Sequence, residues 1–231
     1  MSIANNIKKL NRRIEAAAKR SGRDPTDIKL LVVTKTHSVA TIETALRCGI
    51  EYISENRVQE AENKIPFIKE NFKEFHFIGH LQSNKIKKLM TLNPTLIHSI
   101  DKFSTVQKLN DHLSQLQKKQ DILIQVNTSD EESKFGIKPD TAVDFINQVS
   151  KLPNLNIKGL MTIGMFIADE DIIRKCFLTL RELFEKIKLE KIPNVEMKYL
   201  SMGMTNDFEI AIEEGANIIR IGSAIFGQRN Y

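Results

Sequence analysis

A lysine follows an apolar run near the start of the chain. The run is Leu30 to Val33, and Lys35 comes after it with one threonine between them. A charged ammonium group is costly in apolar surroundings unless it is solvated or paired, and partial desolvation lowers a lysine pKa and makes the neutral amine available as a nucleophile. Lys35 is therefore a candidate to form a Schiff base with an aldehyde. Its position alone favours the plainer interpretation, a strand-end lysine whose ammonium reaches water.

Small hydroxyl and glycine residues gather in two segments near the end of the chain. One segment holds Ser201 and Gly203, and the other holds Gly222 and Ser223. Glycine lets a backbone approach phosphate oxygens closely, and serine adds a hydrogen-bond donor. Either segment alone is a weak signal. Placed together opposite Lys35, they predict a pocket for an aldehyde that carries a phosphate.

Arg220 lies two positions before Gly222 in the last apolar run. Side chains alternate along a strand, so these two residues point to the same side. A guanidinium there could pair with a phosphate or face a pyridine nitrogen. The alternative is a salt bridge between Arg220 and an acidic residue of a neighbouring helix.

Two kinds of apolar pattern alternate along the chain. Continuous apolar runs predict buried strands at residues 30–33, 51–54, 75–78, 95–100, 122–126, 157–161, 195–200 and 218–221. Helical spacing of apolar residues predicts helices at 3–20, 39–47, 58–70, 84–90, 103–116, 141–149, 173–187 and 207–214. Strict alternation of strands and helices implies a parallel sheet.

This pattern predicts an α/β fold, a single (β/α)8 TIM barrel with an extra N-terminal helix. That helix either covers the barrel floor or takes the place of the missing eighth outer helix. The competing doubly wound sheet normally has a glycine-rich turn after its first strand, and residues 34–37 contain no glycine. Every strand is needed to close the barrel, so residues 1–231 are expected to form one domain. In such barrels chemistry takes place at the C-terminal ends of the strands, where Lys35, Ser201 and Gly222 fall.

Composition excludes several classes of protein. Hydrophobic residues make up 41% of the chain and charged residues 27%, which is typical of a globular protein and not of a disordered one. Cys48 and Cys176 belong to no cluster with metal-ligand spacing, so no metal site is expected. The net charge of +5 is spread among acidic residues, which argues against nucleic-acid binding. No signal peptide or membrane span is evident, and a cytoplasmic protein is expected.

Six motifs, in register, resemble those of the pyridoxal phosphate homeostasis protein family. They are LVVTKT at 31–36, ENRVQE at 55–60, HFIGHLQSNK at 76–85, SDEESK at 129–134 with Gly136, LSMGMT at 200–205 and RIGSAIFG at 220–227. The match extends from the first helix to the last few residues. The family is similar to the N-terminal barrel domain of alanine racemase. Arg57 stands where the resemblance predicts a tyrosine, so no role is assigned to it.

The resemblance implies that pyridoxal 5′-phosphate (PLP) is the cofactor and is held covalently as an internal aldimine on Lys35. It also implies that Asn56 lies near the ring hydroxyl of PLP and that Arg220 faces the pyridine nitrogen. The phosphate cradle that it implies consists of Ser201, Gly222 and Ser223.

The resemblance leaves a choice between a carrier and a racemase. An arginine opposite the pyridine nitrogen disfavours protonation of that nitrogen, which weakens the ring as an electron sink. Racemisation also needs a base on each face of the ring. Tyr52 and Tyr199 fall within predicted strands and Tyr231 is the last residue, so none is an evident second base. We therefore expect a reversible PLP carrier or regulator in intracellular PLP homeostasis, with little or no catalysis and no catalytic residue.

Apo PLP-enzymes are expected among the partners of such a carrier, and the chain is expected to be a monomer. Two enzymatic alternatives remain open at this point. One is a PLP-dependent amino-acid racemase. The other is a barrel that uses Lys35 to form an aldolase-like imine with a different phosphorylated metabolite.

Overall fold

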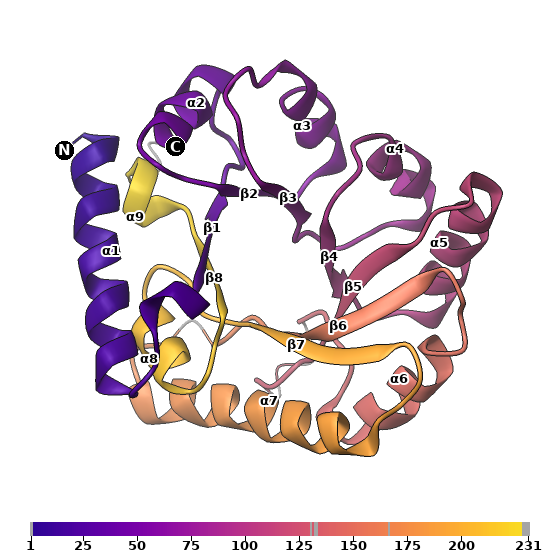
Figure 1. The fold of residues 1–231 in the computed structure, drawn as a ribbon. Helices are drawn as coiled ribbons and strands as arrows, with labels where there is room; N and C mark the ends of the chain where they lie inside the picture. The colour runs from indigo at the N-terminus through magenta and orange to yellow at the C-terminus, as the bar shows by residue number, and fades with distance from the viewer. Residues whose placement is uncertain (1, 130, 132–133, 166, 228–231) are drawn as a thin grey trace.

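The described residues of the computed structural model, 2–129, 131, 134–165 and 167–227, form a closed barrel of eight parallel strands (Figure 1). The strands follow one another in chain order, and β8 pairs with β1 to close the barrel. They are β1 (Lys29–Val33), β2 (Tyr52–Glu55), β3 (Glu74–Phe77), β4 (Leu96–Ile100), β5 (Gln120–Gln125), β6 (Leu155–Met161), β7 (Val195–Ser201) and β8 (Ile218–Ile221). The predicted architecture is confirmed. Asp130, Glu132 and Ser133 of the fourth motif, and Tyr231, lie outside the described residues.

The helices of the described residues surround the strands on the outside (Figure 1). They are α1 (Ile3–Arg20), α2 (Val39–Arg47), α3 (Val58–Glu62), α4 (Ile86–Thr91), α5 (Phe103–Leu116), α6 (Ala142–Val149), α7 (Glu170–Glu190), α8 (Phe208–Glu213) and α9 (Ser223–Phe226). Most begin and end within a few residues of their predicted bounds. The sequence patterns did not predict α9, which follows β8 directly.

The helix predicted at 58–70 is wrong in its second half. Helix α3 ends at Glu62, and only a short 3₁₀ turn at Ile65–Phe67 follows it. Pro66 cannot donate a backbone hydrogen bond and disfavours the helical conformation of Ile65 before it. The apolar spacing through Ile65 and Ile68 reflects packing against the core, not a continuous helix.

Helix α1 takes the place of the eighth outer helix and does not cover the floor. In Figure 1 it lies on the outside of the barrel beside α9 and α8. Ile7, Leu10 and Ile14 recur on one face of α1 and are buried in the main core. Asn6 Nδ2 also donates a hydrogen bond to the carbonyl oxygen of Ile225 in α9, at 2.8 Å. The first helix is thereby joined to the last described one.

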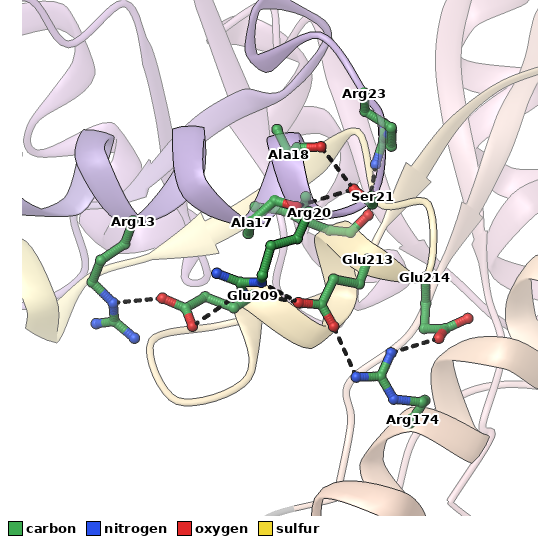
Figure 2. Close-up of polar contacts among 11 residues, drawn as sticks. Arg13, Ala17, Ala18, Arg20, Ser21, Arg23, Arg174, Glu209, Glu213 and Glu214 are labelled. Atoms are coloured by element: carbon green, nitrogen blue, oxygen red, sulfur yellow. Dashed lines mark hydrogen bonds and ion pairs between the residues drawn. The ribbon is translucent and has the colours of Figure 1, made fainter.

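Ion pairs surround the contact between α1, α7 and α8 (Figure 2). Arg20 of α1 contacts Glu213 of α8 at 2.9 Å, and Arg174 of α7 contacts Glu213 and Glu214 at 2.8 Å each. Ion pairs with one partner well exposed to water, as here, contribute little free energy. These ion pairs help to orient the three helices at the edge of their contact, whereas the buried apolar residues stabilise the contact.

The barrel interior has its own layer of side chains, separate from the core between strands and helices. Its apolar part consists of Leu31, Leu96, Leu123, Met161 and Ile218, one from each of five strands. Because side chains alternate along a strand, the polar residues at even spacings from these also point inward. The interior therefore holds charged and polar groups that must find partners within the barrel.

Strand β7 leaves no room for a side chain at Gly159 of β6. Its φ is +144°, and a Cβ built on it would lie 1.9 Å from the carbonyl oxygen of Tyr199. We expect Gly159→Ala to lower the free energy of unfolding by more than about 3 kcal/mol, since backbone must move to admit the methyl group. Gly22→Ala is the matched control, because φ there is +67° but no atom lies within 4 Å of the added Cβ. Equal losses for both variants in urea unfolding would contradict this account.

Candidate functional site

A cavity of about 590 Å³ opens at the C-terminal ends of the strands. Four of the six predicted site residues line it: Lys35, Arg220, Gly222 and Ser223. Asn56 and Ser201 are outside its lining. The sequence assigned no site role to several lining residues of the loops after β6 and β7, namely Met165, Ile167, Ala168, Asn206 and Asp207.

Two side chains bracket the backbone on either side of Lys35. Lys64 Nζ donates to the carbonyl oxygen of Thr34 at 3.1 Å, and Glu60 Oε2 accepts from the backbone N–H of Thr36 at 2.7 Å. Lys64 Nζ also contacts Glu60 Oε2 at 2.9 Å, which joins the two contacts. Thr36 has a φ of +68°, a left-handed conformation that a threonine rarely adopts. The bracket therefore fixes a strained turn that directs Lys35 to the mouth of the barrel.

Glu55 supports this bracket from inside the protein. Its side chain is fully buried, and Oε1 contacts Lys64 Nζ at 2.9 Å and Thr34 Oγ1 at 2.6 Å. Burial raises the pKa of the Glu55 carboxyl, while Thr34 and Lys64 oppose that change. Lys64 is thus the counter-ion of the buried Glu55 carboxylate, and its side chain also donates a hydrogen bond to the backbone carbonyl of Thr34.

Arg220 is buried beside the cavity, and its orientation is fixed by carbonyl and hydroxyl oxygens. Nη1 donates to the carbonyl oxygen and to Oγ of Ser201, both at 2.8 Å, and Nη2 donates to the carbonyl oxygen of Thr162 at 2.7 Å. Burial lowers the pKa of Arg220 to about 10, and the nearby carboxylate of Asp207 opposes this. The guanidinium is therefore charged at neutral pH. The alternative that the sequence left open, a salt bridge with a helix acid, is not among its contacts with the described residues.

Ser201 lies in the barrel interior at the end of β7. Its hydroxyl contacts Arg220 and also His98 Nδ1, at 3.0 Å. The side chain is fully buried. Its predicted place in a phosphate cradle stays a prediction, and its described hydroxyl contacts are with Arg220 and His98.

Helix α9 begins at the cavity with Ser223. Ser223 Oγ lies 3.1 Å from Thr205 Oγ1, which ties α9 to the loop after β7. Phe226 of α9 packs on the ring of His37 with 4.1 Å between centroids.

A Cβ at Gly222 would lie 3.2 Å from the carbonyl oxygen of Val33, so a side chain there would press on the end of β1. A glycine directly after a helix is a common sequence signal for the end of the helix, and Gly227 has that position here.

Asn56 follows β2 and carries a buried acceptor. Within the described part of the chain, Asn56 Oδ1 has no hydrogen-bond partner. A buried carbonyl oxygen without a donor is uncommon and often marks a group that a ligand completes. The observation is compatible with a hydroxyl of a bound ligand.

Comparisons with known proteins agree with the motifs. Residues 3–230 match the family model of the alanine racemase N-terminal domain. The pyridoxal phosphate homeostasis protein of Aquifex aeolicus is 39% identical over 231 residues, which cover 100% of both chains. The chain belongs to the pyridoxal phosphate homeostasis protein family. The predicted resemblance is thereby confirmed.

Similar solved structures include a barrel that contains PLP. PipY of Synechococcus elongatus, solved with PLP bound, has a TM-score of 0.83 and 28% identity, with 98% of this chain and 100% of that chain covered. The same protein without PLP has a TM-score of 0.85 and 30% identity. An alanine racemase of Clostridium difficile shares the fold, with a TM-score of 0.71 at 16% identity over 96% of this chain and 56% of that chain.

Neither a metal centre nor a membrane span is found among the described residues. Among the described residues, no group of three or more His, Cys, Asp or Glu side chains is placed to hold a metal ion. No described helix has both the length and the apolar character that a membrane crossing requires.

The bracket around Lys35 gives a stability prediction. We expect Lys64→Met to lower the free energy of unfolding by about 3 kcal/mol, because it leaves the buried Glu55 carboxylate without a counter-ion. Lys73→Met is the matched control: Lys73 also pairs with a glutamate, Glu51, at 2.8 Å, but its side chain is 63% exposed against 12% for Lys64. Urea unfolding should show little change for the control. A similarly small loss of unfolding free energy for Lys64→Met would contradict the role of Lys64 as the counter-ion of Glu55.

Proposed function

We propose that this chain binds PLP reversibly at the mouth of the barrel through Lys35 and acts in intracellular PLP homeostasis as a carrier or regulator, with little or no catalysis. The observation that carries the proposal is the cavity itself. It brings a lysine from the end of β1 to the same space as a buried arginine and a glycine–serine pair from the end of β8. Membership of a family named for PLP homeostasis, and a relative solved with PLP bound, support it.

The residues present fit PLP group by group. PLP supplies an aldehyde that condenses with a primary amine and releases one water molecule, and Lys35 is the amine. Asn56 Oδ1, a buried acceptor without a donor in the described chain, suits the ring hydroxyl. Arg220 would face the ring nitrogen. The phosphate would lie in the space left beside Gly222 and would accept hydrogen bonds from the hydroxyl and the backbone N–H of Ser223.

Two observations support weak or absent catalysis. Arg220 is held rigidly in its charged form, and a cation opposite the ring nitrogen disfavours protonation of that nitrogen. The tyrosines within the described chain are far from a catalytic position, because Tyr52 and Tyr199 pack around Lys29 at the start of β1. The Lys29 ammonium lies 4.8 Å and 5.2 Å from their ring centroids.

The proposal extends to the partners and state of the protein. We propose that it is a cytoplasmic monomer that gives up PLP to apo-enzymes. A covalent bond between an amine and an aldehyde is reversible in water, which suits a carrier that must release its ligand. Sedimentation of the purified protein tests the monomer, and reactivation of an apo PLP-enzyme by the loaded protein tests the transfer.

The assignment of Lys35 gives the direct test of PLP binding. Wild-type protein mixed with PLP should gain an absorbance band that borohydride treatment makes permanent, with one PLP attached to the peptide that contains Lys35. Lys35→Ala should lose the attachment and bind PLP at least about tenfold more weakly, since the covalent bond is gone. Lys87→Ala, at an exposed lysine of α4, is the control and should behave as wild type. Unchanged affinity and spectrum in Lys35→Ala would show that another group binds PLP.

Racemisation is the competing activity to measure. The PLP-loaded protein incubated with L-alanine or D-alanine should show exchange far below about 1 s⁻¹, the lower end of ordinary enzyme turnover. Chiral chromatography of the amino acid gives the rate. Exchange at or above that rate would favour the racemase alternative.

A further inference from the structure

A continuous row of polar side chains runs through the barrel interior below the mouth. We call Glu74, His76, His98, Ser201 and Arg220 the interior column. Glu74 Oε2 lies 2.7 Å from His76 Nε2, and His76 Nδ1 lies 2.9 Å from His98 Nε2. His98 Nδ1 lies 3.0 Å from Ser201 Oγ, which accepts from Arg220 Nη1 at 2.8 Å. The row crosses from β3 through β4 and β7 to β8.

The column is shielded from water over most of its length and anchored at its lower end. His76 is 1% exposed, His98 and Ser201 are 0% exposed, and Arg220 is 5% exposed. At the lower end, Lys29 Nζ pairs with Glu74 Oε1 at 2.5 Å. Polar groups buried to this degree must be satisfied by one another, so the position of each hydrogen matters.

The two ends of the column determine the direction of every hydrogen bond between them. Hydrogen bonding by His76, together with Lys29, lowers the pKa of Glu74 to about 2, so this carboxylate only accepts. A guanidinium only donates, so Arg220 must give a hydrogen to Ser201 Oγ. Burial lowers the pKa of His76 and holds that of His98 well below its usual value, so both imidazoles are neutral at pH 7.

One arrangement of hydrogens satisfies all of these conditions. His76 carries its hydrogen on Nε2 and donates to Glu74, which leaves Nδ1 as an acceptor. His98 therefore carries its hydrogen on Nε2 and donates to His76, and its own Nδ1 accepts from the Ser201 hydroxyl. Ser201 has then used its single hydrogen and presents only lone pairs to Arg220. A second proton on His98 would place a further cation next to the buried guanidinium.

We propose that the interior column positions Arg220 for the ring nitrogen of PLP, with His98 as the positioning residue that takes the hydroxyl hydrogen of Ser201. This inference rests on the proposed function for its ligand, but not for its hydrogen-bond arrangement. Without an acceptor at position 98, the Ser201 hydroxyl hydrogen is free to turn. The guanidinium then shares the Ser201 hydroxyl with a competing donor and is held firmly only by the carbonyl oxygens of Ser201 and Thr162, so its position is less well fixed.

The arrangement itself is tested without any ligand. Nitrogen-15 NMR of the histidine rings in ligand-free protein should show both His76 and His98 as neutral tautomers with the hydrogen on Nε2. Neither ring should titrate near pH 6.5, where an ordinary histidine changes charge. A hydrogen on Nδ1 of either ring, or a titration near pH 6.5, would overturn the proposal.

The effect on Arg220 is tested with a pair of substitutions at one position. In His98→Asn the amide oxygen replaces Nδ1 as an acceptor for Ser201, whereas His98→Leu has none. We expect His98→Leu to bind PLP about tenfold more weakly and to shift the nitrogen-15 resonance of labelled PLP, and His98→Asn to stay close to wild type on both measures. His112→Leu on α5, a histidine outside the column, is the control for the substitution itself. Equal behaviour of the two His98 variants would overturn the proposal.

The lower end of the column offers a variant at a less buried position. In Glu74→Gln the amide can donate or accept, so the direction of the hydrogen bonds is no longer imposed from that end. The His76 and His98 resonances should then show mixed tautomers, and a single unchanged tautomer would count against the column. This readout also serves if His98→Leu does not fold. A wild-type protein that shows the predicted tautomers but binds no PLP would refute the proposed function and leave the column intact.

Discussion

A positive charge is buried at the mouth of this barrel, and the arrangement of the site follows from keeping that charge satisfied. A guanidinium out of water is stable only when its N–H groups meet acceptors. For Arg220 these acceptors are the carbonyl oxygens of Thr162, directly after β6, and of Ser201 in β7. The strands around the arginine must therefore hold a fixed register. Close contact between β6 and β7 at Gly159 is part of the same requirement, because a side chain there would force the two strands apart.

The two halves of the mouth are stabilised by different means. On the β8 side, two carbonyl oxygens and the Ser201 hydroxyl, which neutral imidazoles orient, hold the arginine. On the β1 side, the lysine is oriented by its backbone: Lys64 and Glu60 hold the residues before and after Lys35. The turn that carries Lys35 is thereby fixed at the mouth of the barrel. Such a fixed turn suits a group that must meet an aldehyde in one position.

The sequence was informative wherever a local pattern determined the outcome. Apolar periodicity predicted α1 with its observed bounds, and side-chain alternation placed Arg220 and Gly222 on one side of β8. Pro66 and the short α3 were missed because apolar spacing was followed past a residue that interrupts a helix. Helix α9 was missed because four residues are too few to show a period.

Contacts across the barrel were beyond any pattern in the sequence. His76, His98 and Ser201 come from β3, β4 and β7, and the hydrogen bonds that join them leave no local pattern in any of these segments. These strands meet only because the sheet curves into a closed cylinder, whose register no single segment specifies. The same holds for Lys64 and Glu55, whose pairing depends on where α3 ends.

The contact between α1 and α9 has a consequence for how the protein matures in the cell. The first helix to leave the ribosome finds part of its packing surface only when the last strand and helix have been made, some two hundred residues later. Until then α1 keeps an apolar face without its partner, and β1 has only one neighbour. The pocket at the mouth, which needs the ends of β1 and β8 side by side, is therefore completed after synthesis of nearly the whole chain. A chain still in synthesis has no complete pocket in which to bind a ligand.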